Sequence, residues 1–287
     1  MENGEPIPPG ADAARLRAVR VAEGDPPDWE AALDHALAAA ELGSALARAE
    51  LAALAGEWGL AQAILAGETI TARDWRALRG AVALEGWLAV PAVKLVSESP
   101  RMALAPGIAT PEMCGWLIAR ARGRLKPAMM FDAREQRNYP GERRTNSACP
   151  FPEAERDLVM AVLRARIAAA CGLAVCGMES PHVLHYAVGQ EFKPHLDAFE
   201  TALTPGFRDR VVTFLVSLND GYEGGETVFP EIGGRWKGRQ GVGFFFWNVL
   251  ADGALDRRVL HAGRPVTAGE KWLLSQWIGA PALAATA

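Results

Sequence analysis

The chain has 287 residues, half of them hydrophobic, with a net charge of −4 and a pI near 5.8. This length and composition allow one large domain, or a domain with an appendage, built around a buried core. The lack of a basic excess argues against nucleic acid or an anionic membrane as a partner, and no apolar run approaches the roughly 20 residues of a membrane span. The N-terminus also lacks the apolar core of a signal peptide, so we expect a cytoplasmic protein.

The N-terminal residues predict a leader followed by helices. Residues 1–27 are rich in Pro, Gly and Ala and are expected to form a flexible leader with at most one short helix near 11–23. Asp28 is a plausible N-cap, and the apolar residues after it recur every four positions, which is typical of an amphipathic helix.

Two further helices are expected before Pro91. The stretch 44–59 predicts the second arm of a helical hairpin, and 71–88 predicts one more helix, opened by a Thr71/Asp74 capping box. This helical segment, 28–92, contains a stretch that resembles a single Sel1-like repeat. Because one copy cannot form a solenoid, we favour a helical cap on the main domain, although the segment could also mediate protein contacts or dimerisation.

Residues 93–287 combine helical patterns with many short β-type runs, which predicts a second, α+β domain. Helices are expected at 110–125 and 152–173. Short β-type runs separated by turn residues follow, at 182–188, 210–219, 226–230, 241–249, 257–263 and 271–278. Many short strands after helices indicate an antiparallel barrel or jelly roll buttressed by helices.

The stretch "HVLHYAVGQEFKPHLDAFE" raises the question of a metal site. Residues two apart in an extended segment face the same side, so His195 and Asp197 can present an imidazole and a carboxylate to one point. His261 is the only histidine downstream of them, and the four cysteines form no C-x-x-C pair. Two histidines and one carboxylate suit Fe(II), because they leave coordination positions open, whereas structural zinc prefers four closed ligands.

Lys271 begins the last predicted strand, ten residues after His261. The strand period places Lys271, Leu273, Ser275 and Trp277 on one face. If that face lines a barrel interior, the ammonium needs an anionic partner, and a bound dicarboxylate would supply one. The alternative is a lysine that extends to the surface.

The region from about residue 93 to 280 resembles the catalytic domain of the prolyl 4-hydroxylase-like 2-oxoglutarate/Fe(II) dioxygenases. The matching stretches, in order, are "YAVGQEFKPHLD", "RVVTFLVSLND", "YEGGETVFP", "GVGFFFWN" and "HAGRPVTAGEKWLLSQW". The resemblance implies a double-stranded β-helix, Fe(II) with 2-oxoglutarate and O2 as cosubstrates, and ascorbate as a reductant.

The resemblance also implies roles for single residues. His195, Asp197 and His261 would bind iron, and Lys271 would bind the distal carboxylate of 2-oxoglutarate. Further cosubstrate contacts are expected from Tyr186, Thr213 and Trp277.

Substrate contacts are harder to assign. The polar segment 129–151 is either a solvated loop or a substrate lid, and the resemblance puts Arg144 forward within it. His182 could also touch substrate, whereas His185 is expected to be structural because it lies on the opposite strand face from Tyr186.

The sequence therefore predicts a hydroxylase that releases succinate and CO2. Its substrate is expected to be a prolyl residue of a peptide or protein, with a free amino acid such as proline, or another small metabolite, as the alternative. Two other classes remain open: a non-catalytic jelly-roll binding module, and a zinc hydrolase that would not need Lys271.

Overall fold

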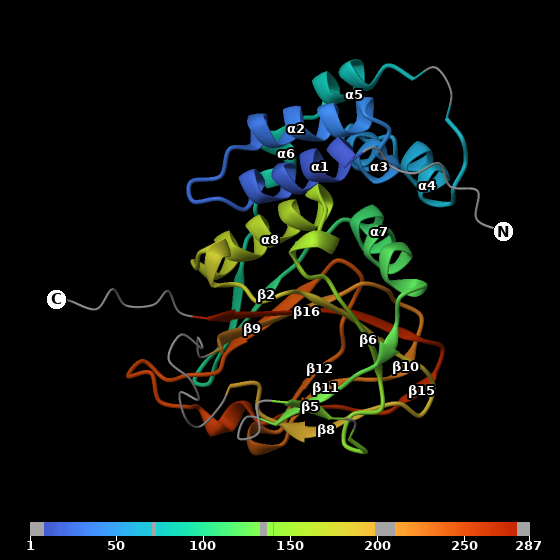
Figure 1. The fold of residues 1–287 in the computed structure, drawn as a ribbon. Helices are drawn as coiled ribbons and strands as arrows, with labels where there is room; N and C mark the ends of the chain where they lie inside the picture. The colour runs from blue at the N-terminus through green and yellow to red at the C-terminus, as the bar shows by residue number, and fades with distance from the viewer. Residues whose placement is uncertain (1–8, 71–72, 133–136, 140, 199–209, 280–287) are drawn as a thin grey trace. The chain divides into compact units, whose positions relative to one another are not determined.

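A computed structural model describes the chain over residues 9–70, 73–132, 137–139, 141–198 and 210–279 (Figure 1). The chain divides into two compact units: Met1–Ala89 with Pro152–Arg166, and Val90–Phe151 with Ile167–Ala287. The sequence-based division at 92/93 stays a prediction. That division cuts the chain at one point, whereas in the structure residues 152–166 belong with the N-terminal helices.

The first unit is helical. Its helices are α1 (Pro9–Ala22), α2 (Trp29–Glu41), α3 (Ala45–Leu54), α4 (Trp58–Leu65), α5 (Trp75–Ala81) and α6 (Leu84–Leu88). Asp28 caps α2 by accepting a hydrogen bond from the Ala31 amide at 3.0 Å, and Ser44 caps α3 in the same way. Gly43 lies between these helices with φ +99°, a conformation that favours glycine. The predicted helical hairpin is thus formed by α2 and α3.

Three helix predictions need correction. Residues 9–22 are not a flexible leader: Ala11, Ala18 and Val19 of α1 are fully buried, because small side chains let α1 pack closely on α2. The single helix expected at 71–88 is two helices, α5 and α6. Asp74 caps α5 itself by accepting from the Ala77 amide, and Thr71 lies outside the described residues. The helix expected at 44–59 ends at Leu54, and α4, which begins at Trp58, was not predicted.

A buried charge network ties residues 152–166 to α1 and the turn after it. The Glu23 carboxylate pairs with Arg156 at 3.0 Å and with Arg164 at 2.8 Å. Arg15 donates to the backbone oxygens of Ala154 and Arg156. These contacts join segments more than 130 residues apart and place the start of α8 (Leu158–Cys171) in the helical unit.

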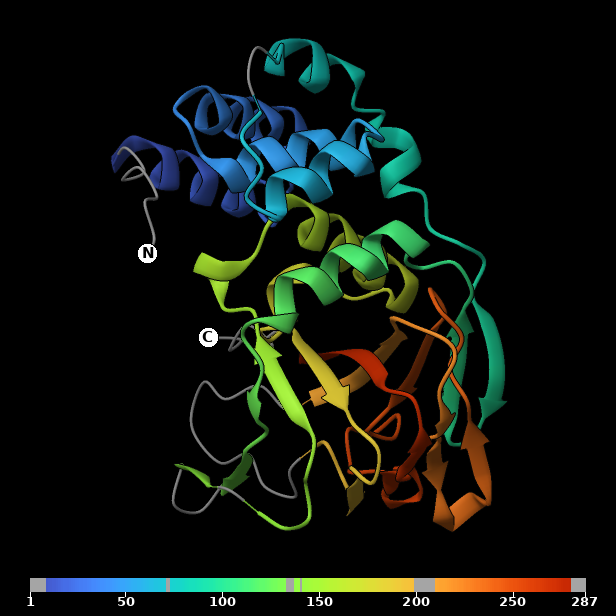
Figure 2. The ribbon, with the colours of Figure 1, turned by 90° about the vertical axis from the view of Figure 1, so that its right-hand side faces the viewer.

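The second unit contains a large antiparallel sheet. Its strand order is β1-β2-β13-β9-β16-β7-β6-β3. The bounds are β1 (Lys94–Glu98), β2 (Arg101–Ala105), β13 (Gly243–Trp247), β9 (Arg210–Ser217), β16 (Lys271–Gly279), β7 (His182–Tyr186), β6 (Ser147–Pro150) and β3 (Lys126–Pro127). Helix α7 (Pro111–Arg122) lies along this sheet (Figure 2), where Arg122 stacks on Trp272 and Cys114 contacts the Ser217 carbonyl.

A smaller antiparallel sheet completes the jelly roll. Its order is β12-β11-β14-β8, with β12 (Gly234–Trp236), β11 (Thr227–Phe229), β14 (His261–Gly263) and β8 (Phe192–His195). Tyr186, Leu215 and Phe246 of the large sheet share one buried cluster with Phe229 of the small sheet, so a core lies between the two sheets. The predicted double-stranded β-helix is confirmed.

The remaining elements are short. They are the pair β4 (Met130–Asp132) and β5 (Arg137–Tyr139), the pair β10 (Glu223–Gly224) and β15 (Val266–Ala268), and the 3-10 helices η1 (Glu153–Glu155), η2 (Val175–Gly177), η3 (Pro230–Ile232) and η4 (Arg257–Val259). The strand predicted at 257–263 is therefore η4 followed by β14, and strands β1 and β2 were not predicted. No helix in the described ranges is long and apolar enough to cross a bilayer.

Candidate metal centre and pocket

Two adjacent strands bring the predicted metal ligands together. Strand β14 pairs with β8 so that His261 lies directly opposite His195, and Asp197 follows β8 by two residues. The Asp197 carboxylate lies between the imidazoles, with Oδ1 3.6 Å from His195 Nε2 and Oδ2 3.5 Å from His261 Nε2. The three side chains offer ligand atoms within 4.8 Å of one another.

Backbone carbonyls orient both imidazoles. The Nδ1 of His195 lies 2.9 Å from the Lys193 carbonyl oxygen, and the Nδ1 of His261 lies 3.0 Å from that of Val259. A carbonyl only accepts, so each Nδ1 carries the proton and each Nε2 keeps its lone pair on the carboxylate side. This arrangement is typical of metal-bound histidines.

The electrostatics of the cluster also suit a divalent cation. Burial, and then the neighbouring His261, lower the pKa of His195, so its imidazole stays neutral. Burial opposes ionisation of Asp197, but His261 and His195 outweigh it and hold the pKa of that carboxyl below its usual value. The neutral His195 imidazole and the ionised Asp197 carboxylate can bind a cation without losing protons, and together with His261 they form a donor set that fits Fe(II).

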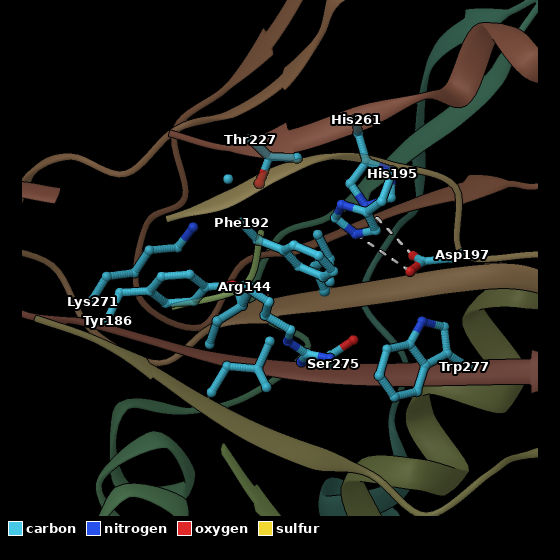
Figure 3. Close-up of a pocket in the computed structure, with 14 residues that line it drawn as sticks. Arg144, Tyr186, Phe192, His195, Asp197, Thr227, His261, Lys271, Ser275 and Trp277 are labelled. Atoms are coloured by element: carbon cyan, nitrogen blue, oxygen red, sulfur yellow. Dashed lines mark ion pairs between the residues drawn. The ribbon is translucent and has the colours of Figure 1, made fainter. Parts of the chain in front are cut away.

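Lys271 lies at the other end of the same pocket, beside Tyr186 (Figure 3). Its Nζ is 5.1 Å from the Tyr186 ring centroid and donates to the Gly225 carbonyl at 2.7 Å. Burial, and then nearby Lys237, lower the pKa of Lys271 to about 8. Among the described residues it has no ion-pair partner, so the pocket offers a buried cation to an anionic ligand.

Gly225 makes this arrangement possible. It has φ +66°, and a Cβ there would lie 3.2 Å from Lys271 Cδ. A larger residue would be strained and would crowd the lysine stem. Gly225, in the stretch "YEGGETVFP", therefore shapes the lysine end of the pocket.

One pocket contains both the metal-ligand candidates and Lys271. It is lined by Arg144, Leu184, Tyr186, Phe192, His195, Asp197, Leu215, Thr227, His261, Gly263, Lys271, Leu273, Ser275 and Trp277. All four members of the predicted β16 face line it, as the period of two requires.

Two predicted site residues have other partners than expected. Thr213 is fully buried, is not part of the pocket lining, and donates its hydroxyl hydrogen to Asp197 Oδ2 at 2.7 Å. The structure thus places Thr213 against a metal-ligand candidate, and its expected contact with the cosubstrate stays a prediction. His182 also lies outside the lining, but its ring meets Trp277 edge-on at 5.2 Å. His185 bonds Glu270 at 2.9 Å, as expected of a structural residue.

Arg144 lines the pocket and stacks on Phe192, which in turn stacks on His195. Its guanidinium lies 4.8 Å from the Phe192 ring centroid, and Phe192 stacks on His195 at 3.5 Å. Burial lowers the pKa of Arg144. The structure thus brings Arg144 near the histidine pair, although parts of its segment, 133–136 and 140, lie outside the described residues.

Sequence reasoning did not assign roles to Arg210 and Glu179. Arg210 makes two hydrogen bonds to the Glu179 carboxylate, at 2.6 and 2.8 Å, and donates to the Asp197 carbonyl at 3.3 Å. Its guanidinium also lies 4.1 Å from the Trp277 ring centroid. The only sequence signal for a role of Arg210 was its position three residues before Thr213 on the same strand. Its partners, Glu179 and Asp197, are 31 and 13 residues away, so no local pattern indicates them.

Comparisons with known proteins agree with this site. A family model described as the 2OG-Fe(II) oxygenase superfamily matches residues 181–279. Prolyl 4-hydroxylase 13 of Arabidopsis thaliana is 33% identical over 204 residues, which cover 64% of this chain and 72% of that protein. Probable prolyl 4-hydroxylase 9 of the same plant is 32% identical over 203 residues, which cover 64% of this chain and 70% of that protein.

A solved structure is similar as well. The 2OG complex of the viral collagen prolyl hydroxylase from Paramecium Bursaria Chlorella virus-1 superposes with a TM-score of 0.51 at 26% identity. The match covers 63% of this chain and 96% of that one. The predicted likeness to 2-oxoglutarate/Fe(II) oxygenases is confirmed, whereas the Sel1-like interpretation of the N-terminal segment stays a prediction.

Proposed function

Since the chain belongs to the prolyl 4-hydroxylase family of 2-oxoglutarate- and Fe(II)-dependent dioxygenases, we propose that it hydroxylates a prolyl residue of a peptide or protein. The enzyme uses Fe(II), 2-oxoglutarate and O2. One observation carries the proposal: a His/Asp/His cluster and a buried lysine that has no ion-pair partner among the described residues share one pocket.

The geometry supports the proposed roles. His195, Asp197 and His261 would hold Fe(II), which would supply the activation of O2 and the oxidative decarboxylation of 2-oxoglutarate to succinate and CO2. Lys271 binds the distal carboxylate of 2-oxoglutarate, and Tyr186 lies beside that ammonium. The burial of Lys271 excludes water, so its pairing with a carboxylate is strengthened.

The substrate is proposed to enter on the side of Arg144, His182 and Trp277. Trp277 is nine-tenths or more buried, contacts Arg210 and the His182 ring, and lines the pocket. An aromatic side chain at this position suits the apolar ring of a prolyl residue. The Arg144 guanidinium could instead take the α-carboxylate of a free amino acid, which keeps free proline as the second candidate.

Turnover measurements separate these substrates. Succinate formation should rise with a proline-containing peptide, and mass spectrometry should find one added oxygen on a prolyl residue. Free L-proline and a peptide with its prolines replaced by alanine are the controls. Stimulation by free proline alone would replace the peptide proposal with the amino-acid one.

A spectroscopic test addresses the chemistry itself. Anaerobic addition of Fe(II) and 2-oxoglutarate should produce the visible charge-transfer band of a chelated keto acid. If no band forms with the folded wild-type protein, the role of the pocket is not the proposed one. Activity with zinc and without 2-oxoglutarate would point to a hydrolase instead.

Four wider expectations belong with this proposal. We place the enzyme in the cytoplasm because its cysteines are free thiols, two of them buried. Ascorbate is proposed as a reductant that restores Fe(II), and segment 129–151 as a lid. The helical N-terminal segment is proposed to mediate protein contacts or dimerisation, which size measurement of the intact and helix-truncated chains would test.

A further inference from the structure

Two fully buried polar side chains lie behind Asp197, outside the pocket lining. Thr213, on β9, donates to Asp197 Oδ2 at 2.7 Å, and Asn248, just after β13, places its Nδ2 3.0 Å from Thr213 Oγ1. Strands β9 and β13 pair so that Phe246 lies opposite Thr213. The three side chains therefore form a chain of hydrogen bonds that runs from β13 to the metal-ligand candidate.

The direction of these hydrogen bonds is determined by chemistry. An ionised Asp197 can only accept, so the single hydroxyl hydrogen of Thr213 is committed to it. The group next to Thr213 must then be a donor, which requires the amide nitrogen of Asn248 to face Thr213 and its oxygen to face away. Within the described part of the chain, Asn248 Oδ1 is buried and has no hydrogen-bond partner. An unpaired buried oxygen destabilises the fold, so its presence indicates that the Asn248 side chain is required for the N–H donor of its amide.

The backbone of Asn248 is linked by hydrogen bonds to a second metal-ligand candidate, His261. Its amide donates to the Val211 carbonyl at 2.8 Å, and its carbonyl accepts from the Asp256 amide at 2.9 Å. Asp256 caps the 3-10 helix η4, whose last residue, Val259, provides the carbonyl that holds His261 Nδ1. Asn248 thus connects to Asp197 through its side chain and to His261 through its backbone.

We propose that Asn248 is a positioning residue of the metal centre: acting through Thr213, its amide fixes the orientation of the Asp197 carboxylate and thereby raises the affinity for the divalent cation. This inference rests on the proposed ligand role of Asp197. Removing such an orienting partner typically weakens metal affinity 10- to 100-fold.

The test measures binding of Co(II) alone to the full chain by isothermal titration, with no turnover required. Asn248→Leu removes the donor and should weaken Co(II) binding about tenfold. Asn248→Asp keeps the side-chain shape but replaces the donor with an acceptor that competes for the Thr213 hydrogen, so we expect a larger loss. A packing role predicts the reverse order, because Asp matches the shape of Asn and Leu does not.

A double-mutant cycle isolates the path through Thr213. Thr213→Val should weaken Co(II) binding about as much as Asn248→Leu or more, and the double variant should bind no worse than Thr213→Val. The double variant also avoids an unfolding artefact, because an apolar group replaces both hydrogen-bonding partners. Thr213→Ser keeps the hydroxyl and should restore binding to near the wild-type level.

The results distinguish this inference from the proposed function. Unchanged Co(II) affinity in Asn248→Leu, or losses that multiply in the double variant, would overturn the role of Asn248 while leaving the metal centre intact. If Asp197→Ala, folded by circular dichroism, binds Co(II) as the wild type does, the ligand assignment itself is wrong. Thermal unfolding without metal controls for a general loss of structure.

Discussion

In the helical unit the largely buried Glu23 carboxylate faces two arginines, whereas in the jelly-roll pocket the buried Lys271 ammonium faces a backbone carbonyl. The first charge is neutralised by its own chain, at 10% side-chain exposure, and the network joins α1 to α8. The second, on the proposed function, is paired by a bound ligand. If so, buried charge serves stability in one unit and binding in the other, and substitutions in the two units should have opposite effects on stability and binding.

The largest expected effect comes from the metal-ligand candidates. Asp197→Ala removes the carboxylate between the two imidazoles and should lower 2-oxoglutarate turnover about a thousandfold or more, beyond the 10- to 100-fold typical of residues that only orient a ligand. Succinate release measures this, and chelation of the metal should match it. Turnover within tenfold of wild type would contradict the assignment.

Glu23→Ala should act on stability alone. It leaves two buried guanidiniums without this carboxylate, a change that costs about 3 kcal/mol in the free energy of unfolding. Denaturant titration measures the loss, and turnover per folded molecule should not change. Glu30→Ala is the matched control: its ion pair with Arg79 has a 70% exposed carboxylate and should contribute less than about 1 kcal/mol. Equal losses in both variants would contradict the comparison.

Lys271→Met should show the opposite signature, a gain in stability with a loss of binding. Burial lowers the pKa of Lys271 from 10.5 to about 8, which corresponds to about 3 kcal/mol of destabilisation below pH 8, where the amine is charged in both states. Losing the bond to Gly225 offsets about 1 kcal/mol. We therefore expect a net gain of about 2 kcal/mol without ligand, and a KM for 2-oxoglutarate raised at least about tenfold. A destabilised variant with unchanged KM would refute both roles.

The smallest expected effect is a pH dependence of the same residue. The cationic amine binds a carboxylate, so affinity for 2-oxoglutarate should be full below the Lys271 pKa of about 8 and should fall as pH rises above it. The KM for 2-oxoglutarate should rise up to about tenfold per pH unit there. Lys271→Arg stays charged throughout and should remove this dependence. An unchanged slope in that variant would assign the titration to another group.

Much of the β-rich unit could be predicted because its signals are local. The period of two placed Lys271 and Trp277 on one face, and the H-x-D spacing placed His195 beside Asp197. The double-stranded β-helix and the oxygenase class were implied by the resemblance of several short motifs, in order, to a known family. The helices were harder: α1 looks like a leader because alanines carry little apolar signal, yet they are the residues that allow close packing on α2.

The sequence by itself determined the ligand types, the strand faces and the reaction class, because these depend on residues a few positions apart or on motif order. Only the tertiary structure decided that His261 lies opposite His195, that Thr213 bonds Asp197 with Asn248 behind it, and that Glu23 meets Arg164. These pairs are separated by between 16 and 141 residues. Sheet register and helix packing bring them together, and no local spacing rule encodes either.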